Sequence, residues 1–159
     1  MNCTMRGTPV GTLFLTATSG HLTHIGWEAT ASDADSSRDC VVDRDLLDRA
    51  VSQLREYFVG ERSSFDLPLA ARGSVFSQRV WHELRHIEPG QPVSYSSLAR
   101  RLHLAHGARA IARACATNPL PIVVPCHRVV GSDGRLRGFL GGLDAKRWLL
   151  EHERPTIAG

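Results

Sequence analysis

The chain has 159 residues, of which 42% are hydrophobic and 22% charged, an ordinary composition for a globular protein that buries a core. No stretch approaches the roughly 18 apolar residues of a membrane span, and residues 1–11 lack a secretory signal, so we expect a cytoplasmic protein without a membrane partner. The formal net charge of +3 divides into −3 for residues 1–73 and +6 for residues 74–159, which is typical of a second half that binds a polyanion.

The beginning of the chain predicts a β-hairpin. Residues 12–17 and 22–27 are apolar stretches on either side of Ser19-Gly20, a pair that favours a tight turn. Residues 29–39 are small, polar and acidic, so we expect a loop there.

A helix and a further strand are expected in the rest of the first half. Apolar residues recur at helical spacing over residues 45–58, and Gly60 is placed to end that helix. Residues 65–69 predict another strand, and residues 70–73 are the candidate linker. The sequence therefore predicts an N-terminal α/β lobe over residues 1–72.

The second lobe, residues 73–159, is predicted to be mainly helical. Helices are expected over residues 76–87, 95–102 and 108–117. Pro89-Gly90 ends the first of them, and a short turn at residues 104–107 separates the other two. Two short helices at this spacing are typical of a helix-turn-helix.

The last of these helices has an unusual composition. Alanine occupies every second position from 108 to 116, and Arg109 and Arg113 add two positive charges. Such a surface can approach a narrow groove and bind phosphates, but it has few side chains that read base edges. Tight packing in a protein core is the alternative explanation for so many alanines.

One cysteine lies in a setting that favours reactivity. Cys126 follows the apolar run 120–124 and precedes His127 and Arg128. The thiolate is the nucleophilic form of cysteine, and a neighbouring imidazole or guanidinium raises its population. Pro125 favours extended geometry before it, so we expect a strand that carries Cys126 at its edge. A buried structural cysteine beside a solvated His-Arg pair is the alternative.

The cysteines and histidines of the chain do not suggest a metal site. The four cysteines, at positions 3, 40, 115 and 126, lack the close pairing of a zinc site or a redox motif, and we expect free thiols. His82 and His86 lie one helical turn apart and are expected to be a surface pair. We predict no metal and no cofactor.

Several separately spaced motifs between Phe76 and Glu153 together resemble the O6-alkylguanine-DNA alkyltransferases, also called methylated-DNA-protein-cysteine methyltransferases. One of these motifs is Pro125-Cys126-His127-Arg128-Val129. The others are, in chain order, Val80-Trp81, Ser94-Tyr95, Leu98-Ala99, Arg109, Asn118-Pro119, Gly141-Gly142-Leu143, Lys146, Leu149-Leu150 and Glu153. The resemblance implies an N-terminal lobe with an antiparallel sheet and a helix, and a helical C-terminal lobe with a helix-turn-helix. It also implies direct, irreversible transfer of an alkyl group from O6-alkylguanine, or O4-alkylthymine, in double-stranded DNA to an internal cysteine.

The resemblance implies a role for each of five residues. Cys126 is the nucleophile of a single-turnover reaction, His127 removes its proton through a water molecule, and Glu153 orients that histidine. Tyr95 donates a proton or a hydrogen bond to the departing guanine. Arg109 fills the gap that the flipped nucleotide leaves in the duplex.

Further contacts are implied for DNA and for the substrate pocket. The implied DNA-binding residues are Ser94, Ala108, Arg109, Ala110, Arg113 and Ala114. The implied pocket residues are Tyr95, Arg128, Val129, Phe139, Leu140 and Gly141. Asn118 is expected to close the turn before the cysteine segment with its side chain, although an ordinary helix end would also explain it. Arg113, Phe139 and Leu140 depart from the family, which more often has glycine, tyrosine and a smaller residue at these positions. Phe139 and Leu140 leave pocket polarity and substrate size open.

Three other functions compete with this interpretation. A non-catalytic alkyltransferase-like protein would lack the nucleophile, so Cys126 argues against it. A transcriptional regulator that senses alkylation would carry an additional cysteine-rich metal domain. A cysteine hydrolase would pair Cys126 with His127, but neighbouring residues of an extended segment point to opposite sides. We expect a monomer and leave cooperative assembly on DNA open.

Overall fold

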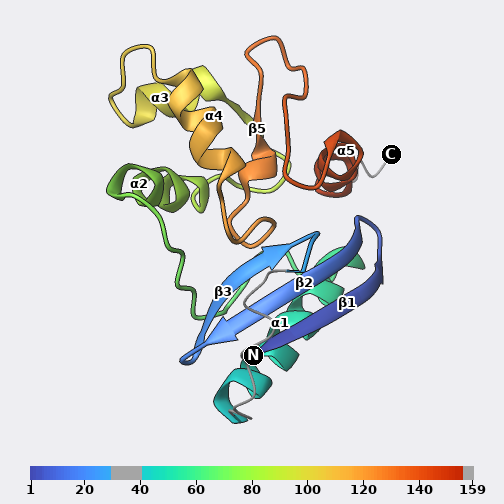
Figure 1. Cartoon of the computed structure of the whole chain (residues 1–159). Coiled ribbons are helices and arrows are strands. Elements are labelled where there is room, and N and C mark those ends of the chain that lie inside the picture. The colour runs from blue at the N-terminus through green and yellow to red at the C-terminus, as the bar shows by residue number, and fades with distance from the viewer. Residues whose placement is uncertain (30–40, 156–159) are drawn as a thin grey trace. The chain divides into compact units, whose positions relative to one another are not determined.

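The computed structural model describes residues 1–29 and 41–155, which fall into two compact units, Met1–Arg72 and Gly73–Gly159 (Figure 1). The loop expected at 29–39, apart from its first residue, and Cys40 lie outside the described residues. No helix in the described part of the chain is long and apolar enough to cross a membrane. Each unit is described by itself below.

The first unit contains a three-stranded antiparallel sheet. Its strands β1 (Asn2–Thr8), β2 (Gly11–Thr18) and β3 (His21–Gly26) pair in the order β1-β2-β3. Ser19 and Gly20 both have positive φ, 51° and 79°, as a two-residue hairpin turn requires. The predicted hairpin is confirmed, whereas β1 is a strand that the sequence analysis did not predict.

Helix α1 (Val41–Phe58) packs against this sheet (Figure 1). Leu13 and Leu15 of β2 are fully buried, as is Leu54 of α1, and burying each such side chain contributes about 1.5–3 kcal/mol. The helix ends at Phe58, and Gly60, with a φ of 82°, turns the chain away just beyond it. The predicted helix is confirmed, and it begins four residues earlier than expected.

The prediction of a strand at residues 65–69 is wrong. Only Leu69 forms a bridge, with Leu22 of β3, through hydrogen bonds of 2.8 and 3.0 Å that involve Pro68 O and Ala70 N. Proline has no amide hydrogen, so Pro68 cannot extend this pairing into a ladder.

The second unit is mainly helical, as predicted. Its elements are α2 (Val75–Leu84), β4 (Val93–Ser94), α3 (Tyr95–Arg101), α4 (Ala108–Ala116), the 3₁₀ turn η2 (Cys126–Arg128), β5 (Val129–Val130) and α5 (Leu143–His152). The three predicted helices correspond to α2, α3 and α4, with ends that differ by up to three residues. The sequence analysis predicted neither α5 nor the short parallel pairing of β4 with β5.

Two close contacts fix α4 in the second unit. The indole Nε1 of Trp81 in α2 donates a buried hydrogen bond of 2.8 Å to the Ala114 carbonyl. Gly107 begins α4 where a Cβ atom would lie 2.6 Å from that of Leu104 and 3.3 Å from that of Ala99. The turn between α3 and α4 therefore requires glycine at this position.

The prediction of a strand before Cys126 is also wrong. Residues 120–124 form a compact, buried turn in which Ile122 has a φ of 76° and Val124 N donates to Leu120 O at 2.8 Å. Asn118 closes this turn, since its Nδ2 donates to Val124 O at 2.9 Å and its Oδ1 accepts from Leu120 N at 3.0 Å. Cys126 consequently begins a 3₁₀ turn instead of standing at a strand edge.

The bond between Trp81 and α4 predicts a stability effect. Trp81→Phe removes a buried donor and leaves a small cavity, so we expect the free energy of unfolding to fall by about 2–3 kcal/mol. Urea unfolding followed by circular dichroism measures this change. Trp148→Phe on α5 is the matched control, because Trp148 is less buried, and it should cost under about 1 kcal/mol. Equal losses in the two variants would contradict the role of the Trp81 bond.

Candidate active site

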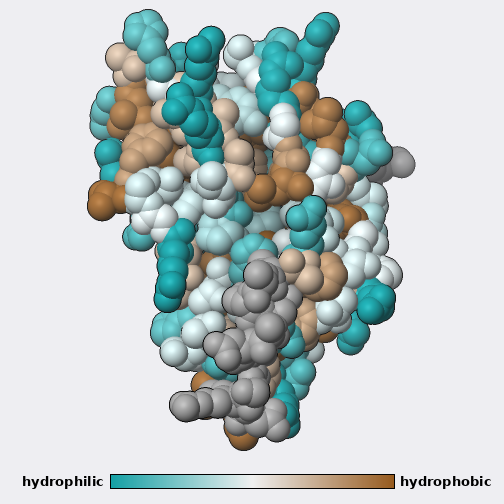
Figure 2. All heavy atoms as spheres, in the orientation of Figure 1, coloured by the Kyte–Doolittle hydropathy of each residue, from teal (hydrophilic) through white to brown (hydrophobic). Residues whose placement is uncertain are grey.

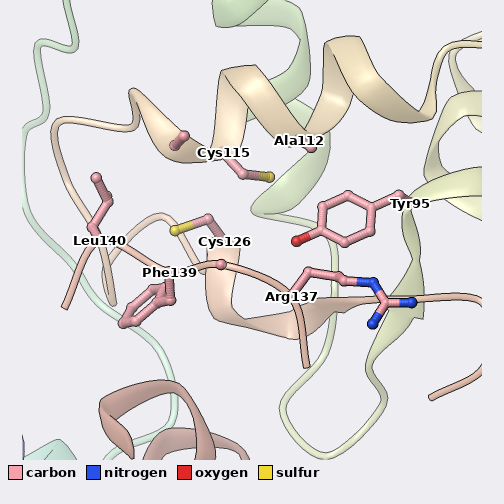
Figure 3. Close-up of a pocket in the computed structure, with 9 residues that line it drawn as sticks. Tyr95, Ala112, Cys115, Cys126, Arg137, Phe139 and Leu140 are labelled. Carbon is pink, nitrogen blue, oxygen red and sulfur yellow. The ribbon is translucent and has the colours of Figure 1, made fainter. Parts of the chain in front are cut away.

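Cys126 lines a pocket of about 260 Å³ in the second unit (Figure 3). The lining residues are Tyr95, Ala112, Cys115, Ala116, Cys126, Arg137, Gly138, Phe139 and Leu140. In Figure 3 the sulfur of Cys115 points toward Tyr95, and the sulfur of Cys126 points toward the side on which Leu140 lies. The volume lies somewhat below the ~300–1,000 Å³ of pockets for drug-sized ligands, which suits a single planar base.

Helix α4 forms one wall of this pocket with small side chains. Ala112, Cys115 and Ala116 are spaced three and four residues apart and so share a helix face. Arg109 and Arg113, four residues apart, are both exposed, and no ion pair in the described residues engages either of them. One short helix thus presents a pocket wall and two free positive charges.

Burial controls the ionisation of Cys126. The side chain is 3% exposed, and this burial raises the pKa of its thiol to about 11, while the Asn118 amide and the Lys146 ammonium lower it less strongly. His127 and Arg128 were expected to favour the thiolate. Arg128 is instead paired with Glu153, and burial keeps the resting Cys126 a thiol at neutral pH.

A buried network follows Cys126 directly. Glu153 at the end of α5 accepts hydrogen bonds from Arg128 Nε at 2.9 Å and Arg128 Nη2 at 2.8 Å, and its Oε2 lies 2.9 Å from His127 Nε2. Arg128 Nη1 also donates to the Ile87 carbonyl at 2.6 Å. Burial opposes ionisation of Glu153, but the hydrogen bonds from Arg128 and His127 outweigh it and hold the pKa of this carboxyl well below its usual range.

The network also fixes the state of His127. Its side chain is fully buried, which lowers the pKa of the imidazole, although the hydrogen bond to Glu153 opposes this shift. A neutral ring beside an ionised carboxylate carries its proton on Nε2. Nδ1 is then a buried acceptor without a hydrogen bond to the described residues, as a general base requires.

Tyr95 adds a polar group to the pocket lining, and Lys146 contacts it. Burial raises the pKa of Tyr95 to about 12, so the phenol keeps its proton at neutral pH. Lys146 Nζ donates to Tyr95 Oη at 3.4 Å and to the Arg137 carbonyl at 3.3 Å. The phenolic oxygen therefore accepts from Lys146 while its own proton stays available for another acceptor.

The structure brings together some of the predicted pocket residues but not all. Tyr95, Phe139 and Leu140 line the pocket with Cys126. The other predicted pocket residues, Arg128, Val129 and Gly141, do not line it. Arg128 is hydrogen-bonded to Glu153, and Val129 is fully buried where β5 pairs with β4.

The predicted DNA-binding residues also divide into two groups. Ala108, Ala110, Arg109 and Arg113 are at least partly exposed on α4. Ala114 is not, because it is 3% exposed and packs in the core near Trp81. Ser94 is partly exposed, and its hydroxyl caps α3 by accepting from Ser97 N at 3.0 Å. Hydrophilic side chains project from the part of the surface that holds these helices (Figure 2).

Several residues that form the site had no predicted pocket role. They are Ala112, Cys115, Ala116, Arg137, Gly138 and Lys146. The helical spacing of Ala112, Cys115 and Ala116 was a usable signal, because residues at i, i+3 and i+4 share a face. No local signal marked Arg137, which enters the wall from the long segment before α5.

The surface histidines show no sign of a metal centre. His82 and His86 stack edge to face with ring centroids 5.0 Å apart, and His86 Nδ1 lies 3.1 Å from the His82 carbonyl oxygen. Over residues 1–29 and 41–155, no three His, Cys, Asp or Glu side chains are grouped to hold a metal ion.

Two family models match nearly the whole chain. The "6-O-methylguanine DNA methyltransferase, DNA binding domain" matches residues 75–155, and the "6-O-methylguanine DNA methyltransferase, ribonuclease-like domain" matches residues 1–71. A methylated-DNA–protein-cysteine methyltransferase of Mycolicibacterium paratuberculosis is 49% identical over 66% of this chain, a segment that spans 64% of that relative's length. The protein of the same name from Methanosarcina barkeri is 35% identical over 94% of both chains.

Solved structures share the architecture. A crystal structure of Mycobacterium tuberculosis OGT in complex with DNA matches with a TM-score of 0.84 and 37% identity, over 98% of this chain and 95% of that one. An O6-methylguanine DNA methyltransferase from Methanococcus jannaschii has a TM-score of 0.69 at 24% identity, over 100% of this chain and 96% of that one. The second likeness concerns the fold alone.

The buried carboxylate predicts a pH-dependent stability. Glu153→Gln leaves Arg128 as a buried charge without its counter-ion, so we expect a loss of about 3–5 kcal/mol at pH 7. The depressed pKa of Glu153 makes its contribution complete above the unfolded value of about 4.3 and lost as the pH falls further. Urea unfolding at several pH values should therefore show a difference between the variant and the native chain that shrinks in acid.

Glu151→Gln is the control, because it removes an exposed carboxylate from the same helix. It should change the free energy of unfolding by under about 0.5 kcal/mol. If the Glu153→Gln variant is as stable as this control, the hydrogen bonds of Glu153 do not make the proposed contribution to the free energy of unfolding.

Proposed function

This chain belongs to the 6-O-methylguanine DNA methyltransferase family, and from that premise we propose that it repairs DNA by moving an alkyl group from O6 of guanine onto Cys126. The observation that carries the proposal is a buried cysteine in a base-sized pocket, directly followed by a histidine that a buried carboxylate holds as a neutral base. The names of the relatives and their match along both units support it.

The first step is removal of the thiol proton. With a pKa near 11, Cys126 is almost entirely protonated at pH 7, so a base must act during the reaction. His127 Nδ1 is the available acceptor, and the proton reaches it through a water molecule. Glu153 then stabilises the imidazolium that forms, and Arg128 keeps that carboxylate in place.

The second step is displacement at the alkyl carbon. The Cys126 thiolate attacks that carbon, the bond from carbon to O6 breaks, and its electron pair remains on the guanine. Tyr95 donates a proton or a hydrogen bond to the departing base, which its high pKa allows. The product is a thioether on Cys126, and nothing in the proposed mechanism cleaves it, so each molecule repairs one lesion.

The substrate must leave the duplex before it reaches the pocket. Extruding a base costs a few kcal/mol, and less where alkylation has already weakened its pairing. We propose that α3, the turn and α4 act as a helix-turn-helix on double-stranded DNA, and that Arg109 occupies the gap in the stack. The exposed position of Arg109 on the helix that forms the pocket wall supports this role.

The proposal also covers the localisation, the oligomeric state and the substrates of the protein. The protein acts as a cytoplasmic monomer on DNA that contains alkylated bases, and O4-alkylthymine is a second possible substrate. Phe139 gives the pocket an apolar wall in place of the tyrosine hydroxyl that is common in the family, and Leu140 is 41% exposed at its rim. These residues give the pocket a more apolar lining.

A cysteine hydrolase is the alternative use of the same residues. In that case Cys126 would form an acyl intermediate and His127 would activate a water molecule. Activity on acyl substrates, with no mass gain from alkylated DNA, would favour this alternative.

The nucleophile predicts a separation of chemistry from binding. Cys126→Ser should abolish alkyl transfer while it leaves DNA affinity unchanged within about twofold, because it changes one atom in a buried pocket. Intact-protein mass spectrometry after incubation with duplex DNA that contains O6-methylguanine should show one added methyl group on the native chain and none on the variant. Cys115→Ser is the control and should still gain the methyl group. Methyl transfer that depends on Cys115 instead would overturn the assignment.

The proposed role of Arg109 predicts a substrate-dependent defect. Arg109→Ala should slow repair of duplex DNA by about tenfold or more but leave reaction with the free base O6-benzylguanine nearly unchanged, because only the duplex requires flipping. Single-turnover rates on both substrates measure this. Arg113→Ala removes an equal charge from the same exposed side of α4 and should have the smaller effect on the duplex. Equal losses of Arg109→Ala on both substrates would show that Arg109 supports the pocket instead.

A further inference from the structure

Lys146 is an unusual residue in the second unit because its ammonium group is buried. The residue is 1% exposed, although lysine is almost never fully buried unless an opposite charge pairs with it. No carboxylate in the described residues forms an ion pair with it. Glu153, which lies seven positions further along the chain, is already held by Arg128 and His127.

The hydrogen bonds of Lys146 are long and go to neutral groups. Nζ lies 3.4 Å from Tyr95 Oη and 3.3 Å from the Arg137 carbonyl oxygen, and 5.7 Å from the centre of the Tyr95 ring. Such contacts hold the ammonium in one position but do not neutralise its charge. Burying an ammonium without a counter-ion is unfavourable, so this residue destabilises the resting fold.

The groups that could supply the missing negative charge are thiols. Cys126 on η2 and Cys115 on α4 line the same pocket as Tyr95 and Arg137, the two residues that accept hydrogen bonds from Lys146, and the ammonium would lower the pKa of either thiol. Among the described residues, Tyr95 on α3, which keeps its proton, and His127, which is neutral at rest, are titratable groups close to Lys146. Arg137 adds a second positive charge to the lining of the same pocket. Burial lowers the pKa of Lys146, and ionisation of Cys126 would raise it.

We propose that Lys146 is a positioning residue of the alkyl-transfer site, whose ammonium becomes the counter-ion of the Cys126 thiolate when the thiol proton leaves. This inference rests on the proposed function, because it assigns Lys146 a part in the same reaction. The charge is in place before the thiolate forms, so no reorganisation is required at that moment. Tyr95 and Arg137, which both line the pocket with Cys126, hold the ammonium in position.

The pH dependence of Cys126 alkylation by iodoacetamide tests the proposal directly. The probe reacts with the thiolate and needs neither DNA nor base flipping. The rate is followed by mass spectrometry of the peptide that contains Cys126, because the other cysteines can also react. Lys146→Met should raise the pH midpoint of the reaction by one unit or more, which makes it about tenfold slower at a fixed pH below that midpoint.

Two further variants make the result specific. Lys146→Arg retains a positive charge and should keep the midpoint within about 0.3 units of the native value, a shift of less than about twofold in rate. Arg147→Met removes a positive charge from the next residue of α5, which is exposed and paired with Asp144, and should leave the midpoint unchanged. An equal shift in Arg147→Met would show a general charge effect and would overturn the proposal.

Stability separates a positioning role from a structural one. Methionine fills a similar volume without a buried charge, so Lys146→Met should melt at the same temperature as the native chain or at a higher one. A lower melting temperature together with an unchanged pH midpoint would make Lys146 a structural residue and overturn the proposal. If Lys146→Met fails to fold, a midpoint in Lys146→Arg more than one unit above the native value overturns it equally.

The same experiment keeps the two proposals apart. Failure of Cys126 to accept an alkyl group from O6-methylguanine in DNA would refute the proposed function, whatever iodoacetamide shows. Normal transfer from DNA in the native chain, together with an unshifted iodoacetamide midpoint in folded Lys146→Met, would refute only the role of Lys146.

Discussion

The carboxylate of Glu153 is the contact on which the active-site region depends, because it holds two consecutive residues of η2 against the end of α5. His127 and Arg128 directly follow Cys126, so fixing their side chains also fixes the backbone that carries the thiol. Arg128 extends the same network to the carbonyl of Ile87, 41 residues away in sequence. One buried charge therefore joins segments that share no local interaction, and its removal leaves another charge buried.

Burial of the thiol has a cost and a benefit. It raises the pKa of Cys126, which keeps the resting residue in its less reactive form. The groups that favour the thiolate, Asn118 and Lys146, are nevertheless already in place, as is the acceptor His127. Under the proposed single-turnover function this arrangement is an advantage, because reaction of Cys126 with any other electrophile would inactivate the molecule. Selectivity thus comes from the pocket, and reactivity from groups organised around it.

Local signals in the sequence predicted most of the helices and the hairpin, because turn chemistry and helical periodicity act over a few residues. Ser19-Gly20 and the spacing over residues 45–58 are examples. Two strands predicted from short apolar runs, the second also from Pro125, were wrong. In residues 65–69 a proline interrupts pairing, and in residues 120–124 the side chain of Asn118 closes the run into a buried turn. An apolar run reports burial, and burial alone does not decide between a strand and a compact turn.

The motif around Cys126 identified a candidate nucleophile and base, whereas Cys115 and Lys146 join the site only through tertiary packing. Alanine at every second position of α4 follows a period of two, whereas the residues on one face of a helix recur every three to four positions. The alternation therefore did not indicate which residues of α4 share a face. That period places Cys115 toward the pocket and Arg109 toward solvent on the same nine-residue helix. The Trp81 hydrogen bond fixes this helix in the second unit. A partner that binds Arg109 therefore acts on the very element that shapes the pocket around Cys126.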